Sequence, residues 1–181
     1  MALEHAILVS LLERSSTGYE LARRFDRSIG FFWKASHQQI YRVLGRMTEA
    51  GWVTATTVPG DGKPDSKVYE PSERGRAELS RWLGEPSDPQ VIRHDLAVKI
   101  RGAAFGDRDA VLADVTRHCE RHAAQLELYR QIEARDFPEP DRLSGHDLAQ
   151  YLVLRGGIIQ EQGFLDWYRE VLDALGPHSG S

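Results

Sequence analysis

Residues 35–53, "ASHQQIYRVLGRMTEAGWV", place hydrogen-bonding side chains on one face of a predicted helix. Ser36 followed three residues later by Gln39 is a capping-box pattern, in which each side chain satisfies a backbone N–H of the other residue. The apolar residues that follow recur at helical spacing: Ile40, Val43, Leu44 and Met47. Gln38 and Arg42 lie opposite this stripe, and their side chains suit bidentate hydrogen bonding to adenine and guanine edges. The segment therefore predicts a short helix that presents a base-reading face.

The flanks of the same helix carry further polar groups. At 100° per residue, His37 and Tyr41 lie on one flank, and Gln39 and Arg46 lie on the other. The unpaired N–H groups and the dipole at the helix start favour a phosphate there. Arg46 stands a turn further along, and we expect it to contact phosphate rather than a base.

The elements predicted around this helix, in chain order, are a helix at 2–13, a second helix opened by the Thr17–Glu20 capping pattern, strands at 52–58 and 66–70, and a helix at 73–83 capped by Ser72. Gly51 ends the base-reading helix, because glycine tolerates the left-handed conformation common at helix ends. Three helices, a hairpin and a fourth helix predict a winged helix-turn-helix. In this architecture the third helix enters the major groove and the wing tip lies on the adjacent backbone.

The second half of the chain reads as helical throughout. The predicted helices are 91–105, about 108–135 and about 146–175. The last two are amphipathic and long, so their apolar stripes must be buried against each other and against a second subunit. Gly156, Gly157 and Gly163 are unfavourable in the last helix, which indicates either close approach of a partner helix or a kink or break there.

The predicted fold is therefore mainly α. Residues 1–84 form a winged helix-turn-helix domain with a two-stranded wing, and residues 85–90 form a linker, because "GEPSDPQ" is rich in Pro and Gly. Residues 91–176 form a helical dimerisation and effector domain.

Charge is distributed unevenly along the chain. The net charge is −4, but residues 1–84 hold 12 basic and 10 acidic residues, a net +2, whereas residues 85–181 hold 11 and 17, a net −6. Segment 14–46 carries seven basic and two acidic residues, a net +5, which fits either a phosphate-binding surface or an ordinary solvated helix surface. One cysteine and no long apolar run favour a cytoplasmic protein without a membrane span or secretory leader.

Two groups of side chains invite other chemistry. His118, Cys119 and His122 share a helix, but zinc needs three or four ligands and no fourth candidate is evident, so we predict no metal. The sequence contains no Gly-x-Ser-x-Gly, no phosphate-binding Gly-rich loop after a strand, and no carboxylate pair with a partner base. We therefore predict no enzyme activity, no catalytic residues and no cofactor.

The stretches "TGYELARRFDRSIGFFWKASHQQIYRVLGRMTEAGWV" and "KVYEPSERGRAEL" resemble the PadR family of bacterial transcriptional regulators. The matching features are the Gly-Tyr-Glu-Leu opening of the second helix, the Ser-x-x-Gln-Ile-Tyr-Arg start of the third, and the Lys-Val-Tyr wing strand. The C-terminal half, with "GGIIQEQGFLDWYREVL", is similar to the longer domain of the virulence-activator branch. The resemblance implies a homodimer on a roughly palindromic operator, usually a repressor, released in many relatives by a small aromatic or phenolic effector.

The residues predicted to contact double-stranded DNA are Tyr19, Ser36, His37, Gln38, Gln39, Tyr41, Arg42, Arg46, Lys63 and Lys67. The residues predicted to line an effector pocket are Phe164, Trp167 and Tyr168, although aromatic residues at helical spacing equally fit plain packing. The alternative function is a winged-helix module for protein–protein contact that does not read DNA.

Overall fold

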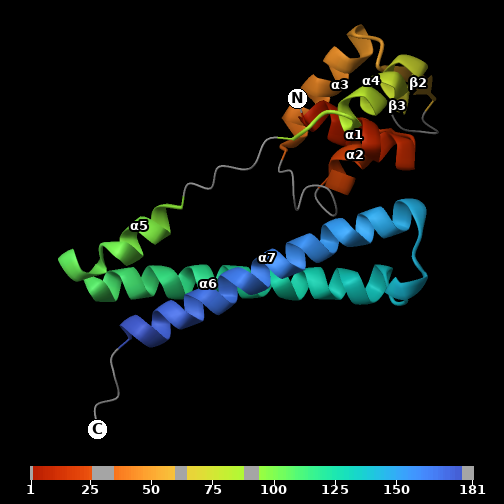
Figure 1. The fold of residues 1–181 in the computed structure, drawn as a ribbon. Coiled ribbons are helices and arrows are strands. Elements are labelled where there is room, and N and C mark those ends of the chain that lie inside the picture. Colours follow the sequence, from red (N-terminus) through yellow and green to blue (C-terminus); the bar gives the residue numbers. More distant parts are fainter. Residues whose placement is uncertain (1, 26–34, 60–64, 88–93, 177–181) are drawn as a thin grey trace. The chain divides into compact units, whose positions relative to one another are not determined.

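The computed structural model describes residues 2–25, 35–59, 65–87 and 94–176, and the chain divides into two compact units, residues 1–89 and 90–181 (Figure 1). The division falls in the Pro- and Gly-rich segment that separates the two halves of the sequence. The helical majority and the small antiparallel sheet confirm the predicted fold class.

In the first unit the elements follow the predicted order. They are α1 (Ala2–Glu13), β1 (Ser16–Thr17), α2 (Gly18–Phe25), α3 (His37–Glu49), β2 (Val53–Val58), β3 (Ser66–Pro71) and α4 (Glu73–Leu83). The helix predicted to read bases is α3, and the strands of the wing are β2 and β3. Residues 26–34, which follow α2, lie outside the described residues.

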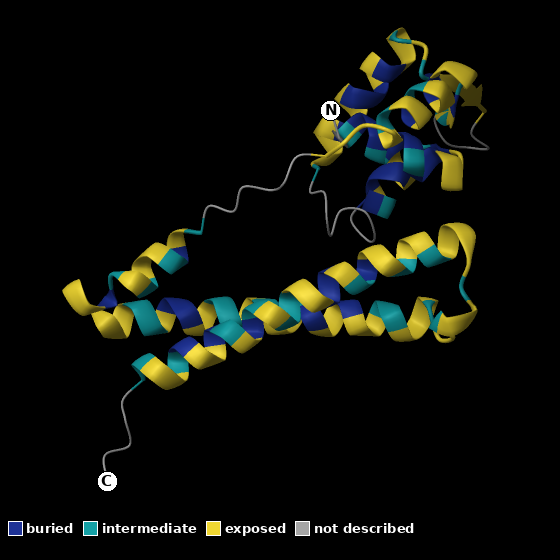
Figure 2. Ribbon diagram, viewed as in Figure 1, coloured by how far each residue is buried: buried dark blue, intermediate teal, exposed yellow. Residues whose placement is uncertain are grey.

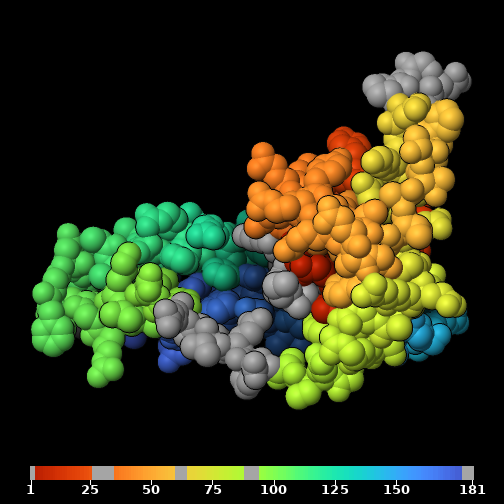
Figure 3. Space-filling view, turned by 90° about the horizontal axis from the view of Figure 1, so that it is seen from above, coloured from red at the N-terminus to blue at the C-terminus, as the bar shows by residue number. Residues whose placement is uncertain are grey.

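The sheet has one strand more than the sequence predicted. The strand order is β1-β3-β2, and both pairs are antiparallel. Strand β1 pairs Ser16 with Tyr69, so the short connection between α1 and α2 is hydrogen-bonded to the wing. Two residues are too few to give an alternating pattern, which is why this strand was missed. Strands β2 and β3 pair from Val53–Pro71 to Val58–Ser66 and project from the body of the unit (Figure 3).

The turn after α3 is tied to the start of α4. Gly51 has a φ of +71°, which confirms its predicted place at the helix end. The Ser72 hydroxyl donates to the Gly51 carbonyl at 2.6 Å, and the Ser72 N–H donates to the Trp52 carbonyl at 2.9 Å. One turn into α4, a Cβ on Gly75 would lie 2.1 Å from the Trp52 carbonyl oxygen. Only glycine therefore allows this close approach.

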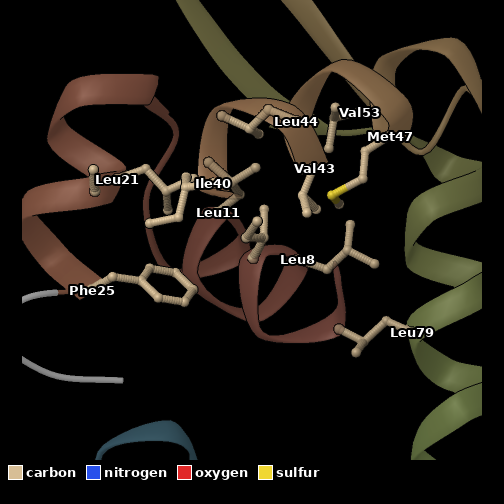
Figure 4. Packing of buried hydrophobic residues seen from close by; sticks show 12 residues of the cluster. Leu8, Leu11, Leu21, Phe25, Ile40, Val43, Leu44, Met47, Val53 and Leu79 are labelled. Atoms are coloured by element: carbon tan, nitrogen blue, oxygen red, sulfur yellow. The ribbon is translucent and has the colours of Figure 1, made fainter. Parts of the chain in front are cut away.

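The core of the first unit lies where α1, α2, α3 and the base of the wing meet (Figure 4). Its buried members are Ile7, Leu8, Leu11, Leu21, Ala22, Phe25, Ile40, Val43, Leu44, Met47, Val53 and Leu79. The predicted stripe of α3 is thus fully buried. His5 is buried at the edge of this core, where its ring stacks on Trp82 at 4.3 Å and its Nε2 contacts Glu78 at 3.2 Å.

The described elements of the second unit are α5 (Asp95–Arg101), the 3-10 helix η2 (Ala103–Phe105), α6 (Arg108–Asp136), the 3-10 helix η3 (Pro140–Arg142) and α7 (Gly145–Leu175). The prediction of a single helix over 91–105 is wrong, because α5 ends at Gly102 and only a 3-10 turn follows. Residues 91–93 lie outside the described residues. Helices α6 and α7 pack side by side along much of their length (Figure 1).

Helix α7 runs as one α-helix of 31 residues through its three glycines. The predicted alternative of a break at these positions is therefore wrong. Its inward face includes Leu154, Ile158 and Leu165, which are buried, whereas much of the opposite surface is exposed (Figure 2). Large apolar side chains on this exposed surface include Leu152 and Ile159, at 58% and 63% exposure.

Candidate nucleic-acid interface

The start of α3 is defined by a reciprocal pair of side chain to backbone hydrogen bonds. The Gln39 N–H donates to the Ser36 hydroxyl at 3.2 Å, and the Ser36 N–H donates to the Gln39 side-chain oxygen at 2.8 Å. This geometry confirms the predicted capping box. It fixes the position of the first turn of α3 and leaves that turn exposed at its outer side.

The face of α3 opposite the core is open to solvent. Its exposed residues are His37, Gln38, Tyr41, Arg42, Gly45 and Glu49. A Cβ added to Gly45 would have no heavy atom within 4 Å, so no described residue of the unit covers this part of the helix. Among the described residues, no hydrogen bond or ion pair engages the side chains of Gln38 or Arg42. Both side chains are available to an external partner.

Tyr41 lies against the start of α2. A Cβ on Gly18 would come within 2.5 Å of the Tyr41 ring, so the glycine lets the ring lie directly on the helix. Tyr41 keeps 48% of its surface exposed, and neighbouring Tyr19 keeps 58%. The Arg23 guanidinium lies 5.9 Å from the Tyr19 ring centre, within cation–π range. The sequence did not reveal Gly18 as a support for Tyr41, because the two residues belong to different helices.

Two flank residues of α3 already have partners within the unit. The Gln39 side chain belongs to the capping box, and the Arg46 Nη2 donates to the Glu4 carboxylate of α1 at 2.8 Å. The Arg46 side chain is nonetheless 55% exposed, whereas that of Glu4 is 11% exposed. The predicted phosphate contact of Arg46 must therefore coexist with an ion pair that the sequence did not indicate.

Part of the predicted basic segment serves the fold. The Arg24 guanidinium donates to the Ser10 carbonyl at 2.9 Å, to the Arg14 carbonyl at 2.7 Å, and to the Ser16 hydroxyl. It thereby satisfies carbonyl groups at the C-terminal end of α1. Burial lowers the pKa of Arg24, so the site disfavours its charge slightly. The net +5 of segment 14–46 consequently overstates the charge that faces outward.

The wing and the start of α2 complete this surface. Lys67 is exposed on β3, opposite Thr57 of β2. Lys63 lies outside the described residues. At the start of α2 the Glu20 carboxylate accepts from the Thr17 N–H at 2.9 Å, and the Glu20 N–H donates to the Thr17 hydroxyl at 3.2 Å, as the capping pattern predicted. Hydrogen bonds from Thr17 lower the pKa of Glu20.

The predicted effector residues belong to an aromatic and histidine cluster in the second unit. Phe164 and Trp167 are partly exposed, but Tyr168 is 0% exposed and its burial raises the pKa of its hydroxyl. Tyr168 is therefore part of the core of this unit. His94 Nε2 lies 3.4 Å from the Tyr168 hydroxyl, and the His94 ring stacks near Phe164 at 5.7 Å. No pattern in the sequence singles out His94.

Each of the two helix histidines lies close to a carboxylate. His122 pairs with the Glu161 carboxylate of α7, and His118 lies 3.7 Å from Asp114. Burial lowers the pKa of His118. Within the described ranges, no group of three or more His, Cys, Asp or Glu side chains could hold a metal ion.

A separate hollow lies on the surface of the second unit. It has a volume of about 450 Å³ and is formed by residues of α6 and α7: Arg130, Glu133, Arg155, Ile158, Ile159, Gln162, Gly163 and Asp166. None of the three predicted effector residues lines it.

In the part of the chain that the structure describes, no helix is long and apolar enough to span a membrane.

The order of elements, the buried stripe of α3 and its exposed polar face define a winged helix-turn-helix, the architecture of a large class of DNA-binding proteins. Residues 7–81 match the family model described as "Transcriptional regulator PadR-like family", and residues 92–176 match "Virulence activator alpha C-term". The chain is 53% identical to the probable transcriptional regulator Rv1176c of Mycobacterium tuberculosis, over 97% of this chain and 98% of that protein. The chain belongs to the PadR-like family.

Two solved structures are similar over nearly the whole chain. The Vibrio cholerae virulence activator AphA is 31% identical with a TM-score of 0.80, over 96% of this chain and 97% of that one. Bacillus subtilis PadR in complex with operator DNA is 25% identical with a TM-score of 0.84, over 97% and 99%. The same Bacillus protein has also been solved in complex with p-coumaric acid. These matches confirm the resemblance noted in the sequence.

Proposed function

We propose that the protein is a repressor that binds operator DNA through the outward face of α3. The observation that carries the proposal is the availability of Gln38 and Arg42 on a helix whose opposite side is fully buried. Gln can form two hydrogen bonds with adenine and Arg can form two with guanine, so these side chains supply sequence readout. The complex of Bacillus subtilis PadR with operator DNA supports this role.

The other contacts position the helix on the duplex. Ser36 and the positive end of the helix dipole offer a phosphate site at the start of α3. His37, Tyr41 and Tyr19 are exposed around the same end and extend the contact surface. Arg46 and the wing residues Lys63 and Lys67 contact phosphates of the flanking backbone in this proposal. Phosphate contacts carry affinity and salt dependence, whereas base contacts carry specificity.

We propose that the protein acts as a homodimer through the exposed side of α7. Leu152, Gly156, Ile159 and Gly163 follow one another at spacings of four and three residues, so they share one helix face. A Cβ on Gly156 or on Gly163 would meet nothing within 4 Å, which leaves room for a close partner helix. A two-fold dimer implies a palindromic operator. Ile159→Arg should shift the species measured by light scattering from dimer to monomer, and an unchanged dimer mass would reject this interface.

We further propose that a small aromatic effector binds at the cluster of Phe164 and Trp167, with Tyr168 forming the wall behind them. The partial exposure of the first two rings supports this location, as does the p-coumaric acid complex of Bacillus subtilis PadR. Adding p-coumaric acid should release operator DNA from the wild type, and Trp167→Leu should abolish that release. Equal release from both proteins would place the effector elsewhere. We also propose that the protein is cytoplasmic, because its proposed partner is DNA and its sequence has a single cysteine. We propose no catalytic activity for it.

The test of DNA binding is selection of bound sequences from random duplex DNA by the full chain. We expect enrichment of a palindrome whose half-sites are about one helical turn, 10–10.5 base pairs, apart. Arg42→Ala should then weaken binding to the selected duplex by about 1–3 kcal/mol and leave binding to scrambled duplex unchanged. Failure to enrich any sequence would reject operator recognition. An Arg42→Ala protein that binds the selected duplex like the wild type would reject α3 as the reading element.

A further inference from the structure

Glu4, in the first turn of α1, lies mostly buried beside the last turn of α3. Its side chain is 11% exposed, and its carboxylate oxygen Oε1 lies 2.8 Å from Arg46 Nη2. A carboxylate removed from water costs free energy unless a partner compensates it. In the described part of the chain, the Arg46 guanidinium donates a hydrogen bond to this carboxylate and so provides the compensation. The ion pair therefore connects the far end of α3 to a helix 42 residues earlier in the chain.

Arg46 faces outward from this pair. Its side chain is 55% exposed, and the contact with Glu4 uses one of its two terminal nitrogens. A guanidinium has five N–H donors and stays charged at any relevant pH, so most of its donors remain available. The carboxylate of the pair is thus buried, and an approaching phosphate would meet the exposed guanidinium.

We infer that Glu4 is a positioning residue for the DNA interface, because it holds the Arg46 guanidinium in place for a backbone phosphate. This inference rests on the proposed function and adds α1 to the surface that serves it. The capping box of Ser36 and Gln39 fixes the first turn of α3. The pair of Glu4 and Arg46 fixes a side chain of the last turn, so both ends of the helix are set before DNA arrives.

Glu4 has two opposing effects on a phosphate bound by Arg46. Its negative charge repels the phosphate, but Coulomb energy falls with distance and the cation lies on the exposed side of the pair. Holding a long arginine side chain in the unbound protein removes part of the ordering cost that binding would otherwise incur. We expect the second effect to exceed the first, and the two effects predict opposite results when the charge of Glu4 is removed.

The experiment measures the dissociation constant and its salt dependence for the full chain on the duplex selected above. The variants are Glu4→Gln, Arg46→Ala, their double mutant, Arg42→Ala and the matched control Glu49→Gln. Glu49 is exposed on α3, so its substitution removes an equal charge near the DNA without touching the pair. Thermal unfolding of each variant is measured in parallel.

Glu4→Gln should weaken operator binding about 2- to 10-fold, the effect of ordering one long side chain, whereas Glu49→Gln should strengthen it or leave it unchanged. Arg46→Ala should lower the slope of log K against log salt by about one, and Glu4→Gln should have no further effect in the Arg46→Ala protein. A purely structural pair would change the unfolding temperature and leave the salt slope as it is.

The inference is overturned if Glu4→Gln strengthens binding as Glu49→Gln does, if the two substitutions add independently, or if Arg46→Ala leaves the salt slope unchanged. In each of these cases Arg42→Ala should still weaken binding to the selected duplex and leave binding to scrambled duplex unchanged, and that result keeps the proposed operator binding. A wild-type protein that does not distinguish the selected duplex from a scrambled one overturns both.

Discussion

Gly18→Ala is expected to impair DNA binding through Tyr41 while leaving the fold intact. The added Cβ would lie 2.5 Å from Tyr41 Cε1, whereas ordinary contacts begin at 3.4 Å, so the ring must retreat by about 0.9 Å. The obstacle is one edge of an exposed side chain, which can move. Alanine in a helix gains up to about 1 kcal/mol over glycine, which offsets the displacement, and we expect the free energy of unfolding to change by less than about 1 kcal/mol.

The loss of free energy of operator binding should be larger than the change in the free energy of unfolding. Hydrogen bonds weaken beyond about 3.2 Å, so a shift near 0.9 Å is enough to lose a contact between the Tyr41 hydroxyl and a phosphate. A hydrogen bond to a charged group contributes about 1.5–3 kcal/mol, which corresponds to about a tenfold to hundredfold rise in Kd. Fluorescence anisotropy with the selected duplex measures the Kd, and circular dichroism during heating measures stability.

The double mutant with Tyr41→Ala decides whether the ring carries the effect. If it does, Gly18→Ala should change nothing further once Tyr41 has been truncated. Two results would refute the reasoning. One is a large fall in unfolding temperature with an unchanged Kd, and the other is the same loss of affinity in the Tyr41→Ala protein as in the wild type.

Two further predictions concern the stability of the first unit. Gly75→Ala should destabilise it by about 1–3 kcal/mol or more, because the new Cβ would lie 2.1 Å from the Trp52 backbone oxygen and the turn must shift. An unfolding temperature equal to that of the Gly18→Ala protein would contradict this prediction. Hydrogen bonds from Arg81 and then His5 lower the pKa of Glu78 to about 2 from an ordinary 4.5. The stabilisation from the Glu78 carboxylate is complete above pH 4.5 and is lost as the pH falls towards 2, so Glu78→Gln should reduce the acid sensitivity of unfolding followed by circular dichroism. Equal acid sensitivity of the two proteins would show that this carboxylate is not responsible.

Helix α3 was predictable because its evidence is contiguous. The capping residues, the apolar stripe and Gly51 all lie within 16 residues, and each acts over one or two turns. Strand β1 was not predictable, because its two residues become a strand only by pairing with Tyr69 and Val68. The break at Gly102 was missed for a related reason, since a single glycine inside an apolar pattern is compatible with a continuous helix.

The charged and aromatic side chains considered for the predicted sites show the same limit. Arg24 and Arg46 count as positive charge in the sequence, but their partners come from α1 and from the segment that follows it. Tyr168 lies on the same stretch of helix as Phe164 and Trp167, yet the packing of α5 and α6 buries it completely. Periodicity identifies the face of a helix, whereas the distance to another segment decides whether a side chain on that face remains available.

The lack of intramolecular partners for Gln38 and Arg42 has a consequence for evolution. Substitutions at these two positions remove no hydrogen bond, ion pair or core contact among the described residues, so the scaffold does not constrain them. Under the proposed base readout, duplicated copies of such a gene would acquire new operators by single changes there while they keep the same fold. Gly18, Gly75 and Ser36 have the opposite character, because each is required by a neighbouring segment. Regulatory networks built from this scaffold can therefore diversify in target sequence without a matching loss of stability.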